Sequence, residues 1–314
     1  MKKYALGVDI GGTTIKMGLF TTEGKLLEKW EIKTRTQQDG SFILSDIAVS
    51  AKNKLKEKGI ELEGVEGIGM GVPGPVDEHG TVLRCVNLGW GVFNVEDAMS
   101  ELMGGIRAQA GNDANVAALG EMWKGGGEGY QNVVMVTLGT GVGGGIIVNG
   151  KIVAGADGAG GEIGHFQMKK DETEICGCGK RGCLEQYASA RGIARMGRLK
   201  LEADQRESVL RDAETLTAKA IFDAARQKDE VALELVEELG EMLGTALSFI
   251  GSVTNPEVFV IGGGVSKAGT IVTDVIQKYY EKYAFHAAAK TPFALAKLGN
   301  DAGIYGSVKM ILQV

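Results

Sequence analysis

Two stretches of the chain share one pattern of apolar runs and glycine-rich turns. Over residues 4–20, an apolar run, a Gly-Gly-Thr turn and a second apolar run predict a strand, a turn and a strand, with another turn at Glu23–Gly24. The pattern returns over residues 133–151, with a Gly/Thr turn at 139–141. Because the two stretches lie about one domain length apart, an internal duplication is the economical interpretation.

Other parts of the chain show helical periodicity or short buried runs. Helices are expected at 45–58, 191–228 and 231–250. Asn255–Pro256 ends the last of these, and a final helix is expected from about Ala302, returning to the first domain. Apolar runs bounded by turn residues predict buried strands at 65–72, 106–110 and 258–261. The mixture of strands and helices indicates an α/β protein.

Length and composition bound the architecture. A chain of 314 residues with 44% hydrophobic residues can form two domains with sizeable cores. We expect a small α/β domain made of residues 1–120 with 300–314, and a large α/β domain made of residues 121–299. The glycine run 125–129 marks a mobile connection near the boundary. The 49 glycines against 4 prolines cluster between predicted strands, which suggests close approach of the backbone to ligands.

Charge and targeting patterns exclude several classes of function. The net charge is −6 and no basic patch is interleaved with aromatic residues, so nucleic acid binding is not expected. Lys2 and Lys3 precede an apolar run that Asp9 interrupts too early for a signal peptide. The uncharged stretch 133–148 is too short and too rich in glycine to span a membrane. Cysteines arranged for a metal fit a reducing compartment, so we expect a cytoplasmic protein.

Three of the four cysteines and one of the three histidines gather in one short segment. Cys176, Cys178 and Cys183 follow His165, and glycines separate the cysteines. Cys176 and Cys178 are too close in sequence to bridge each other comfortably, whereas three thiolates and an imidazole suit a tetrahedral zinc ion with no open position for water. We therefore expect a structural Zn²⁺ that fixes a polar loop. Reduced structural cysteines beside a surface histidine are the alternative.

Two glutamates flank the predicted zinc site. Glu162 lies shortly before His165, and Glu185 lies shortly after Cys183. A zinc-braced loop would hold both carboxylates in place, and His165 can offer its second ring nitrogen to a neighbour or to a ligand hydroxyl. Carboxylates and an imidazole that converge in this way can hydrogen-bond a polyol. Solvated loop charges are the alternative for either glutamate alone.

Turns after predicted strands have the composition of phosphate-binding loops. The first places the Asp9 carboxylate beside the turn 11–13, where backbone N–H groups, a hydroxyl and an acid can hold phosphate oxygens and a divalent cation. The spacing is not that of a Walker A loop, and a tight hairpin without a ligand is the alternative. The turn 262–264, which opens a helix after the strand 258–261, suits a nucleoside or a phosphate.

The start of one predicted helix and the remaining cysteine complete the candidate positions. Asn112 and Asp113 close a short strand and open a helix that runs through Glu121, and either residue could simply be the helix N-cap. Cys85 lies outside the predicted zinc ligands, and we expect a buried core thiol there rather than a redox role.

Together these motifs resemble the ROK family (repressor, open reading frame, kinase) of bacterial glucokinases, within the actin-like sugar kinases. The resemblance covers essentially the whole chain. It is carried by the segments Asp9–Thr13, Gly71–Pro75, Asn87–Trp90, Asn112–Asn115, Leu138–Gly141, Gly161–His165, Cys176–Glu185 and Gly262–Val265. Many members carry Glu where this chain has Gly111, which weakens assignment to a subgroup. The resemblance implies two actin-like (ribonuclease H-like) α/β domains with a cleft between them and a zinc-stapled loop in the larger domain.

The resemblance also implies an ATP:hexose 6-phosphotransferase that converts glucose to glucose 6-phosphate with Mg²⁺ and ATP. Asp113 would be the general base. The sugar would be bound by Gly74, Asn87, Asn112, Asp113, Glu162, His165 and Glu185. The ATP site would comprise Asp9, Gly11, Gly12, Thr13, Thr14, Gly139, Thr140, Gly141, Gly263, Gly264 and Val265, with Asp9 near Mg²⁺. The zinc ligands would be His165, Cys176, Cys178 and Cys183.

Alternatives stay open at this point. A kinase for N-acetylmannosamine, fructose or allose would share the sugar-binding motif, and polyphosphate could replace ATP as the donor. A sugar-responsive repressor would need an added DNA-binding domain, and only three residues precede Tyr4. A non-catalytic sugar-binding protein is disfavoured by Asp113, Asp9 and the phosphate turns. Members of the family commonly form homodimers or homotetramers, so we expect one of these, with no nucleic acid or membrane partner.

Overall fold

The computed structural model describes residues 2–313, which form two compact units. The first unit contains the chain up to residue 129, residues 145–161 and the segment from 298 onward. The second contains residues 130–144 and 162–297. This division differs from the expected domains chiefly because 145–161 groups with the first unit, and the expected domain boundaries stay a prediction. Within residues 2–313, no helix is both long enough and apolar enough to cross a membrane.

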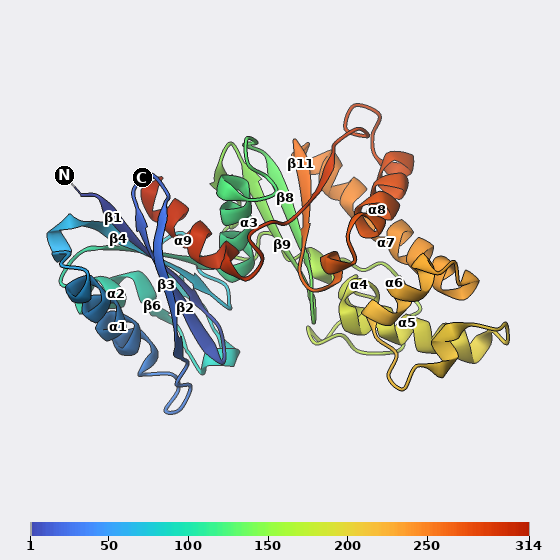
Figure 1. Ribbon diagram of the computed structural model, residues 1–314, viewed down its shortest axis with the longest axis horizontal. Coiled ribbons are helices and arrows are strands. Elements are labelled where there is room, and N and C mark those ends of the chain that lie inside the picture. The colour runs from blue at the N-terminus through green and yellow to red at the C-terminus, as the bar shows by residue number, and fades with distance from the viewer. Residues whose placement is uncertain (1, 314) are drawn as a thin grey trace. The chain divides into compact units, whose positions relative to one another are not determined.

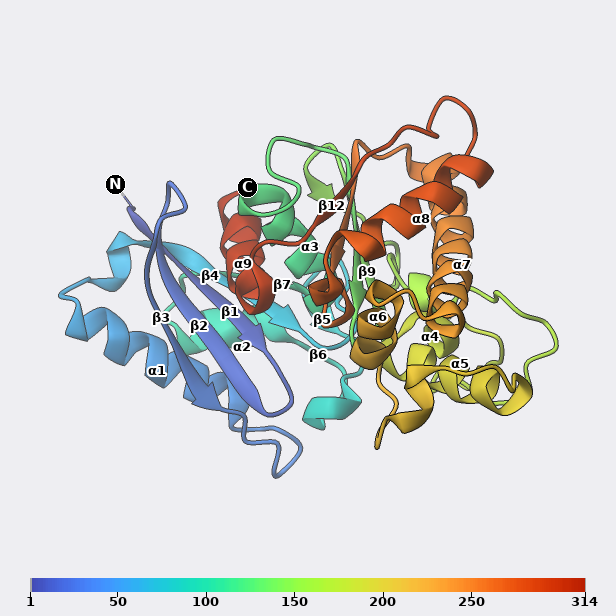
Figure 2. The ribbon, with the colours of Figure 1, turned by 45° about the vertical axis from the view of Figure 1, so that its right-hand side comes forward.

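The first unit is built on a five-stranded sheet with the order β3-β2-β1-β4-β7 (Figure 1, with β7 labelled in Figure 2). Its strands are β1 Tyr4–Ile10, β2 Thr14–Thr21, β3 Leu26–Lys33, β4 Val65–Val72 and β7 Arg107–Asn112. β1 and β2 form the predicted antiparallel hairpin, while β4 pairs in parallel with both β1 and β7. The strand expected at 65–72 is confirmed, and the strand expected at 106–110 runs on to Asn112.

Helices cover both faces of this sheet because successive side chains of a strand point to opposite faces. Leu6, Val8 and Ile10 of β1 share a core with α1 Ile43–Glu57 and α2 Val95–Leu102. Ala5, on the other face, packs with α9 Ala302–Leu312. The final helix therefore does return to the first unit, where it lies beside the first strands (Figure 1).

Glycines allow α9 to approach its neighbours closely. A Cβ atom at Gly69 of β4 would collide with the carbonyl oxygen of Ser307. The helix α3, Asp113–Lys124, packs along α9 in the same way (Figure 2). A Cβ atom at Gly120 would collide with the carbonyl oxygen of Ala302, and one at Gly306 with that of Val116. The α3–α9 pair is thus a close-packed unit whose spacing depends on the absence of side chains.

The second sheet has the order β10-β9-β8-β11-β12. Its strands are β8 Val133–Leu138, β9 Val142–Val148, β10 Lys151–Ile152, β11 Val258–Gly262 and β12 Phe293–Leu295. β9 and β10 are antiparallel, and β11 pairs in parallel with β8 and β12. When β8, β9 and β10 are matched to β1, β2 and β3, the strand order is that of the first sheet. The topology agrees with the internal duplication that the sequence pattern predicts.

The second unit carries its helices in sequence after the cysteine-rich segment. They are α4 Glu185–Ala188, α5 Ala190–Ala203, α6 Ala218–Arg226, α7 Glu230–Thr254 and α8 Thr270–Tyr283. The expected helix at 231–250 is confirmed as α7, and its apolar residues Leu235, Leu243 and Leu247 are buried. Asn255 ends α7 in the left-handed conformation, with φ of 43°. α7 packs against α8, and both views show the two helices side by side (Figure 2).

Shorter elements complete the chain. β5 Thr81–Val82 and β6 Phe93–Asn94 form a two-stranded antiparallel sheet. Single turns of 3₁₀ helix occur at Leu62–Gly64, Val86–Leu88, Ile163–His165, Val209–Asp212, Val265–Ala268 and Gly299–Asp301. The expected helix after the turn 262–264 therefore begins as a 3₁₀ turn, and α8 follows it.

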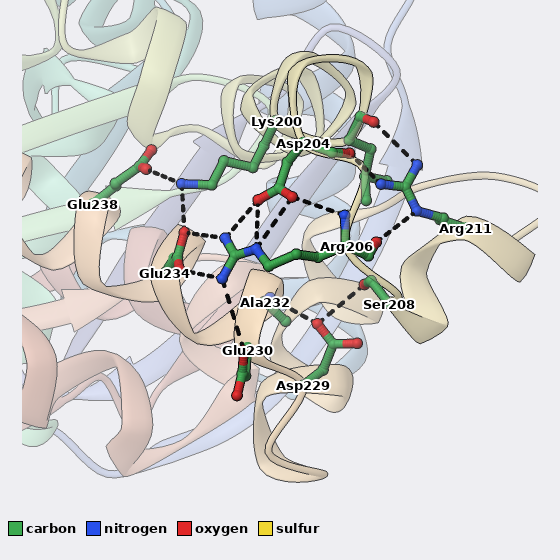
Figure 3. A network of polar contacts seen from close by, with 11 residues as sticks. Lys200, Asp204, Arg206, Ser208, Arg211, Asp229, Glu230, Ala232, Glu234 and Glu238 are labelled. Carbon is green, nitrogen blue, oxygen red and sulfur yellow. Dashed lines mark hydrogen bonds and ion pairs between the residues drawn. The ribbon is translucent and has the colours of Figure 1, made fainter.

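The expected helical stretch 191–228 is interrupted between α5 and α6, and the interruption is held by polar contacts (Figure 3). Arg206 binds Asp204 of the loop and Glu234 of α7, with N–O distances of 2.8 and 2.9 Å. The carboxylate of Asp229 accepts hydrogen bonds from the Ser208 hydroxyl and, as the N-cap of α7, from the backbone. The backbone N–H groups of Arg206 and Leu210 donate to the side chains of Asp204 and Ser208, and such bonds compete with the helical ones, which explains why a helix does not continue here.

Candidate functional site

The four predicted metal ligands lie together in the second unit. One ligand atom from each of His165, Cys176, Cys178 and Cys183 lies within 4.8 Å of all the others. The Sγ atoms of Cys178 and Cys183 are 3.6 Å apart, and Cys176 Sγ is 3.8 Å from His165 Nδ1. Zn–S bonds of about 2.3 Å in a tetrahedron place sulfur atoms roughly 3.8 Å apart. The cluster therefore fits a zinc ion.

The pKa values of the three thiols shift in different directions. Burial raises the pKa of Cys176, and burial together with the neighbouring thiols raises the pKa of Cys183 to about 12. The backbone N–H of Lys180, by contrast, lowers the pKa of Cys178. Desolvated thiols of this kind become thiolates only when a positive charge compensates them, and a bound Zn²⁺ supplies that charge.

Glycines shape the loop that carries the cysteines. Gly179 and Gly182 have positive φ angles of 85° and 73°, a conformation that favours glycine. The backbone N–H of Cys176 donates to the carbonyl oxygen of Lys180, and that of Gly179 donates to Cys176, both at 2.8 Å. These bonds close the tight turn that brings Cys176 and Cys178 to the same side of the loop.

The two predicted glutamates lie at the metal cluster, as the spacing suggested. Glu162 Oε2 is 3.8 Å from His165 Nε2, the ring nitrogen that faces away from Cys176. Glu185 has one carboxylate oxygen 3.8 Å from Cys176 Sγ, and the other accepts a hydrogen bond of 3.0 Å from the backbone N–H of Val142. Glu185 thus connects the cysteine cluster to the end of the turn 139–141.

A buried ion pair, which the sequence pattern did not indicate, braces the same loop. Both carboxylate oxygens of Glu172 lie 2.9 Å from Nη2 of Arg195 in α5, and the Tyr187 hydroxyl donates to one of them at 2.5 Å. The Glu172 side chain is only 7% exposed. Burial alone would raise the pKa of Glu172, but hydrogen bonds from Tyr187, the Glu174 backbone and Arg195 outweigh it and lower the pKa to about 2. The loop before the cysteines is therefore tied to α5.

The N-terminus of α3 in the first unit carries the candidate base. Asn112 is the N-cap, since its side-chain oxygen accepts from the backbone N–H groups of Ala114 and Asn115 at 3.0 and 3.3 Å. Its amide nitrogen donates to the carbonyl oxygen of Gly74 at 3.3 Å. Asp113 is therefore the first helical residue rather than the cap, and its half-buried carboxylate also accepts from the N–H of Ala114.

The sheet brings the other predicted residues of the first unit to one edge. Asp9 of β1 is in register with Gly71 of β4, and Gly71 is in register with Gly111 of β7. The carboxyl ends of parallel strands, where ligands bind in open α/β sheets, therefore carry Asp9, the 73–75 turn and Asp113. At the adjoining turn 11–13, Gly12 and Thr13 are exposed. The exposed Asn87 lies in the 3₁₀ turn Val86–Leu88, and its backbone approaches Gly12.

Asp9 has a neighbour that the sequence analysis did not single out. Lys16 Nζ lies 3.6 Å from Asp9 Oδ2 and also donates to the carbonyl oxygen of Asn300. Burial raises the pKa of Asp9, although the Lys16 ammonium opposes that change. A partly desolvated carboxylate is stabilised by a nearby cation, so this position fits either a lysine contact or a divalent metal bound through water.

Gly264 in the second unit borders a cavity, and Gly263 precedes it in the turn after β11. Gly263 has φ of 83°, and a Cβ atom there would collide with the backbone of Leu138. The cavity, of about 400 Å³, is lined mainly by the α6 region and the turn after β11. Lining residues are Ala190, Thr217, Ala218, Lys219, Phe222, Asp223, Arg226, Gly264, Val265, Lys267 and Ala268. The α6 wall was missed from sequence, because its apolar positions look like those of any amphipathic helix.

The turn 139–141 lies in the same unit. The Gly139 carbonyl oxygen accepts from the backbone N–H of Ala190 at 2.8 Å, which links the turn to the start of α5 and to the cavity wall. Thr140 is exposed. A Cβ atom at Gly141 would collide with the Glu185 carboxylate. Each unit thus holds part of the predicted site. Asp9, the turn 11–13, Gly74, Asn112 and Asp113 belong to the first unit, and the metal cluster, Glu162, Glu185 and the turns 139–141 and 262–264 belong to the second.

Cys85 is buried and is not close to the metal ligands in sequence. Its Sγ lies 3.0 Å from the carbonyl oxygen of Pro73, and its side chain belongs to the core of the first unit. The expectation of a buried core thiol is confirmed.

Comparisons with known proteins agree with this architecture. The model of the ROK family matches residues 5–314. The glucokinase of Halalkalibacterium halodurans is 42% identical over 316 residues, covering 99% of this chain and 96% of that protein. The glucokinase of Thermotoga maritima is 35% identical, covering 99% and 98%.

A solved structure is similar in both sequence and fold. The crystal structure of a ROK family glucokinase from Streptomyces griseus, in complex with glucose and AMPPNP, matches with a TM-score of 0.74 and 34% identity over 98% of each chain. Since the family model and these relatives cover nearly the whole sequence, the chain belongs to the ROK family.

Proposed function

We propose that this protein transfers the γ-phosphoryl group of ATP to the 6-hydroxyl of glucose. The observation that carries the proposal is the end of β7, where the Asn112 cap leaves Asp113 as the first residue of α3 with its carboxylate at the ligand-binding edge of the sheet. The full-length similarity to proteins named glucokinases supports a sugar kinase, and the relative solved with glucose and AMPPNP supports ATP as donor.

Asp113 is the general base in this proposal. It accepts the proton of the sugar hydroxyl while that oxygen forms a bond to the γ-phosphorus, and the bond from the γ-phosphorus to the β–γ bridging oxygen breaks to release ADP. A positioned base of this kind contributes roughly 10²–10⁴-fold. Most of the remaining acceleration comes from positioning and charge neutralisation, because the transition state of phosphoryl transfer is loose.

The sugar would be held by polar groups from both units. In the first, these are Asn87, Asn112 and the backbone at Gly74, and in the second they are Glu162, His165 and Glu185. Zn²⁺ at the cysteine cluster would fix the loop that carries the second group. Polar partners of this kind reject sugars that lack a hydroxyl, because a buried group is then left without a hydrogen bond.

The donor would be bound by the glycine turns. Gly11, Gly12 and Thr13 with Thr14, and Gly139, Thr140 and Gly141, would contact phosphates, and Asp9 would approach Mg²⁺ through water. The cavity beside Gly263, Gly264 and Val265 offers Phe222 and Ala218 as apolar walls for the nucleoside. Closing the site around the sugar would exclude water, which otherwise competes as an acceptor.

A coupled ADP-release assay tests the proposal. Mg²⁺–ATP is offered with a panel of hexoses and N-acetylated hexosamines, and a kcat/KM highest for glucose is expected. A preference for N-acetylmannosamine, fructose or allose would support the proposed kinase activity but show that glucose is not the substrate. Replacing ATP with polyphosphate in the same assay tests the donor. Absence of sugar-stimulated ADP release would refute the kinase and favour a sugar-binding protein.

We further propose that the protein assembles as a homodimer or homotetramer, as is common in this family. Light scattering coupled to size-exclusion chromatography measures the mass of the assembly. A monomer at micromolar concentration would refute this part of the proposal.

A further inference from the structure

The chain passes between the two units at four places, and one residue contacts the backbone near two of them. The passages lie after residues 129, 144, 161 and 297. The helix α3 ends shortly before the first, at Lys124, and α9 begins shortly after the last, at Ala302. Glu121, near the C-terminal end of α3, lies close to both segments.

The Glu121 carboxylate accepts a hydrogen bond from each segment. Its Oε2 accepts from the backbone N–H of Gly126 at 2.7 Å, and its Oε1 accepts from the backbone N–H of Leu298 at 2.8 Å. The Glu121 backbone carbonyl also accepts from Gly125 and Gly127, both at 3.0 Å. Glu121 has no exposed surface. All of these atoms belong to the first unit, so the contacts are internal to one compact body.

The glycine run 125–129 is explained in part by this contact. A Cβ atom at Gly125 would collide with the Glu121 carboxylate, so a side chain at 125 would displace it. The sequence suggested that the whole run is a mobile connection. The structure shows instead that its first three residues are held to Glu121 by hydrogen bonds.

The opposite end of α3 carries Asp113. The helix is close-packed against α9 at Gly120 and Gly306, so neither helix can move without the other. The two segments tied by Glu121 are therefore linked to one rigid helix pair, and that pair presents Asp113 at its far end.

We propose that Glu121 is a positioning residue that fastens both connecting segments to α3, so that any movement of the second unit is coupled to the helix that carries Asp113. The proposal rests on the proposed function, in which closure around the sugar places the 6-hydroxyl at Asp113. Without the Glu121 carboxylate the segment at Leu298 loses this bond to α3, and the 125–127 turn keeps only its bonds to the Glu121 backbone, so closure aligns the reacting groups less often.

The test compares Glu121→Gln with Glu128→Gln in the full-length protein. Glutamine keeps the shape of the side chain but turns an NH₂ group toward one of the two N–H donors, so at least one bond is lost. Glu128 lies in the same glycine segment, is exposed and pairs only loosely with Lys124 at 3.9 Å. Amide hydrogen exchange without substrates is measured on the peptides that contain Gly126 and Leu298, followed by kcat and the dissociation constant of the sugar.

We expect Glu121→Gln to speed exchange at one or both amides at least tenfold and to lower kcat at least tenfold, with the sugar dissociation constant changed less than threefold. Glu128→Gln should match the wild type in all three. Unchanged exchange, or a kcat within twofold of the wild type in a folded Glu121→Gln protein, would overturn the proposal. A merely structural role would lower thermal stability without this split between kcat and binding.

A second variant covers the case in which Glu121→Gln does not fold. Leu298→Pro removes only one of the two donors, and φ of −77° at Leu298 suits proline. Leu298→Pro should lower kcat at least tenfold, and a kcat within twofold of the wild type in the folded variant would overturn the proposal. If the wild type shows no sugar-stimulated ADP release, the proposed function fails, whereas exchange at the two amides still decides whether Glu121 holds both segments.

Discussion

The buried ion pair of the cysteine loop makes a pH-dependent contribution to stability that can be measured. The substitution Glu172→Gln removes the negative charge to which Arg195 and the Tyr187 hydroxyl both donate hydrogen bonds. The pKa of Glu172 falls from an ordinary value of 4.5 to about 2 in the folded protein. At about 1.36 kcal/mol per pKa unit, this corresponds to at most about 3 kcal/mol of stabilisation at neutral pH.

The sign of the pH dependence follows from the lowered pKa. The unfolded chain takes up the proton first as the pH falls, so the stabilisation is complete above about pH 4.5 and is lost between there and about pH 2. Glu172→Gln lacks this contribution at every pH. The difference in unfolding free energy between the two proteins should therefore be largest at pH 7 and shrink steadily below pH 4.5.

Urea unfolding followed by circular dichroism at 222 nm, at pH 7, 4.5 and 3, measures that difference. A chelator is present in every sample. All samples are therefore free of zinc, and release of zinc in acid cannot change the comparison between pH values. The matched control is Glu174→Gln, which also loses a contact with Arg195, at 2.9 Å, but from a side chain that is 61% exposed. The control should cost less than about 1 kcal/mol. A Glu172→Gln deficit that is equally large at pH 7 and pH 3 would refute the reasoning.

Other predictions follow from single positions. Asp113→Asn should lower kcat by roughly 10²–10⁴-fold while sugar binding measured by calorimetry persists, and near-normal turnover would remove it as the base. Cys178→Ser should lose zinc measured by plasma mass spectrometry and raise the sugar KM, whereas full zinc content with normal kinetics would contradict a structural metal. Phe222→Ala should raise the KM for ATP with little change in the KM for the sugar. A raised KM for the sugar with an unchanged KM for ATP would show that the nucleoside binds elsewhere. Gly306→Ala should destabilise the protein by about 1–3 kcal/mol in thermal unfolding, while Gly91→Ala, which faces open space, should not.

Local patterns were sufficient for the two hairpins, for α7 and for the metal cluster. The hairpins around 11–13 and 139–141 and the helix α7 follow from periodicity and turn residues within a few positions of one another. The four metal ligands could be found because three of them lie within a span of eight residues, and their softness and spacing suit zinc. In both cases the residues that interact are close in sequence, so pattern and structure carry the same information.

The interruption of the 191–228 stretch shows where such patterns fail. Charged residues continue through 204–217 at spacings that suit a helix, but Arg206 binds Asp204 and reaches Glu234 of α7 instead of lying on the surface of a continuing helix (Figure 3). Likewise, the sequence could not separate Asn112 from Asp113 as the cap. The hydrogen bond from Asn112 to Gly74, distant in the chain, accompanies the cap in the structure.

The sequence by itself predicted the duplicated strand–turn–strand units, the four candidate zinc ligands and, through the family resemblance, the residues proposed to carry the chemistry. Only the tertiary structure decided how those residues are supported: Glu172 pairs with Arg195, Glu185 contacts Val142, and Glu121 contacts Leu298. The physical reason is that a supporting contact needs only one buried partner at the right distance. Folding brings that partner from anywhere in the chain, so no spacing in the sequence records it.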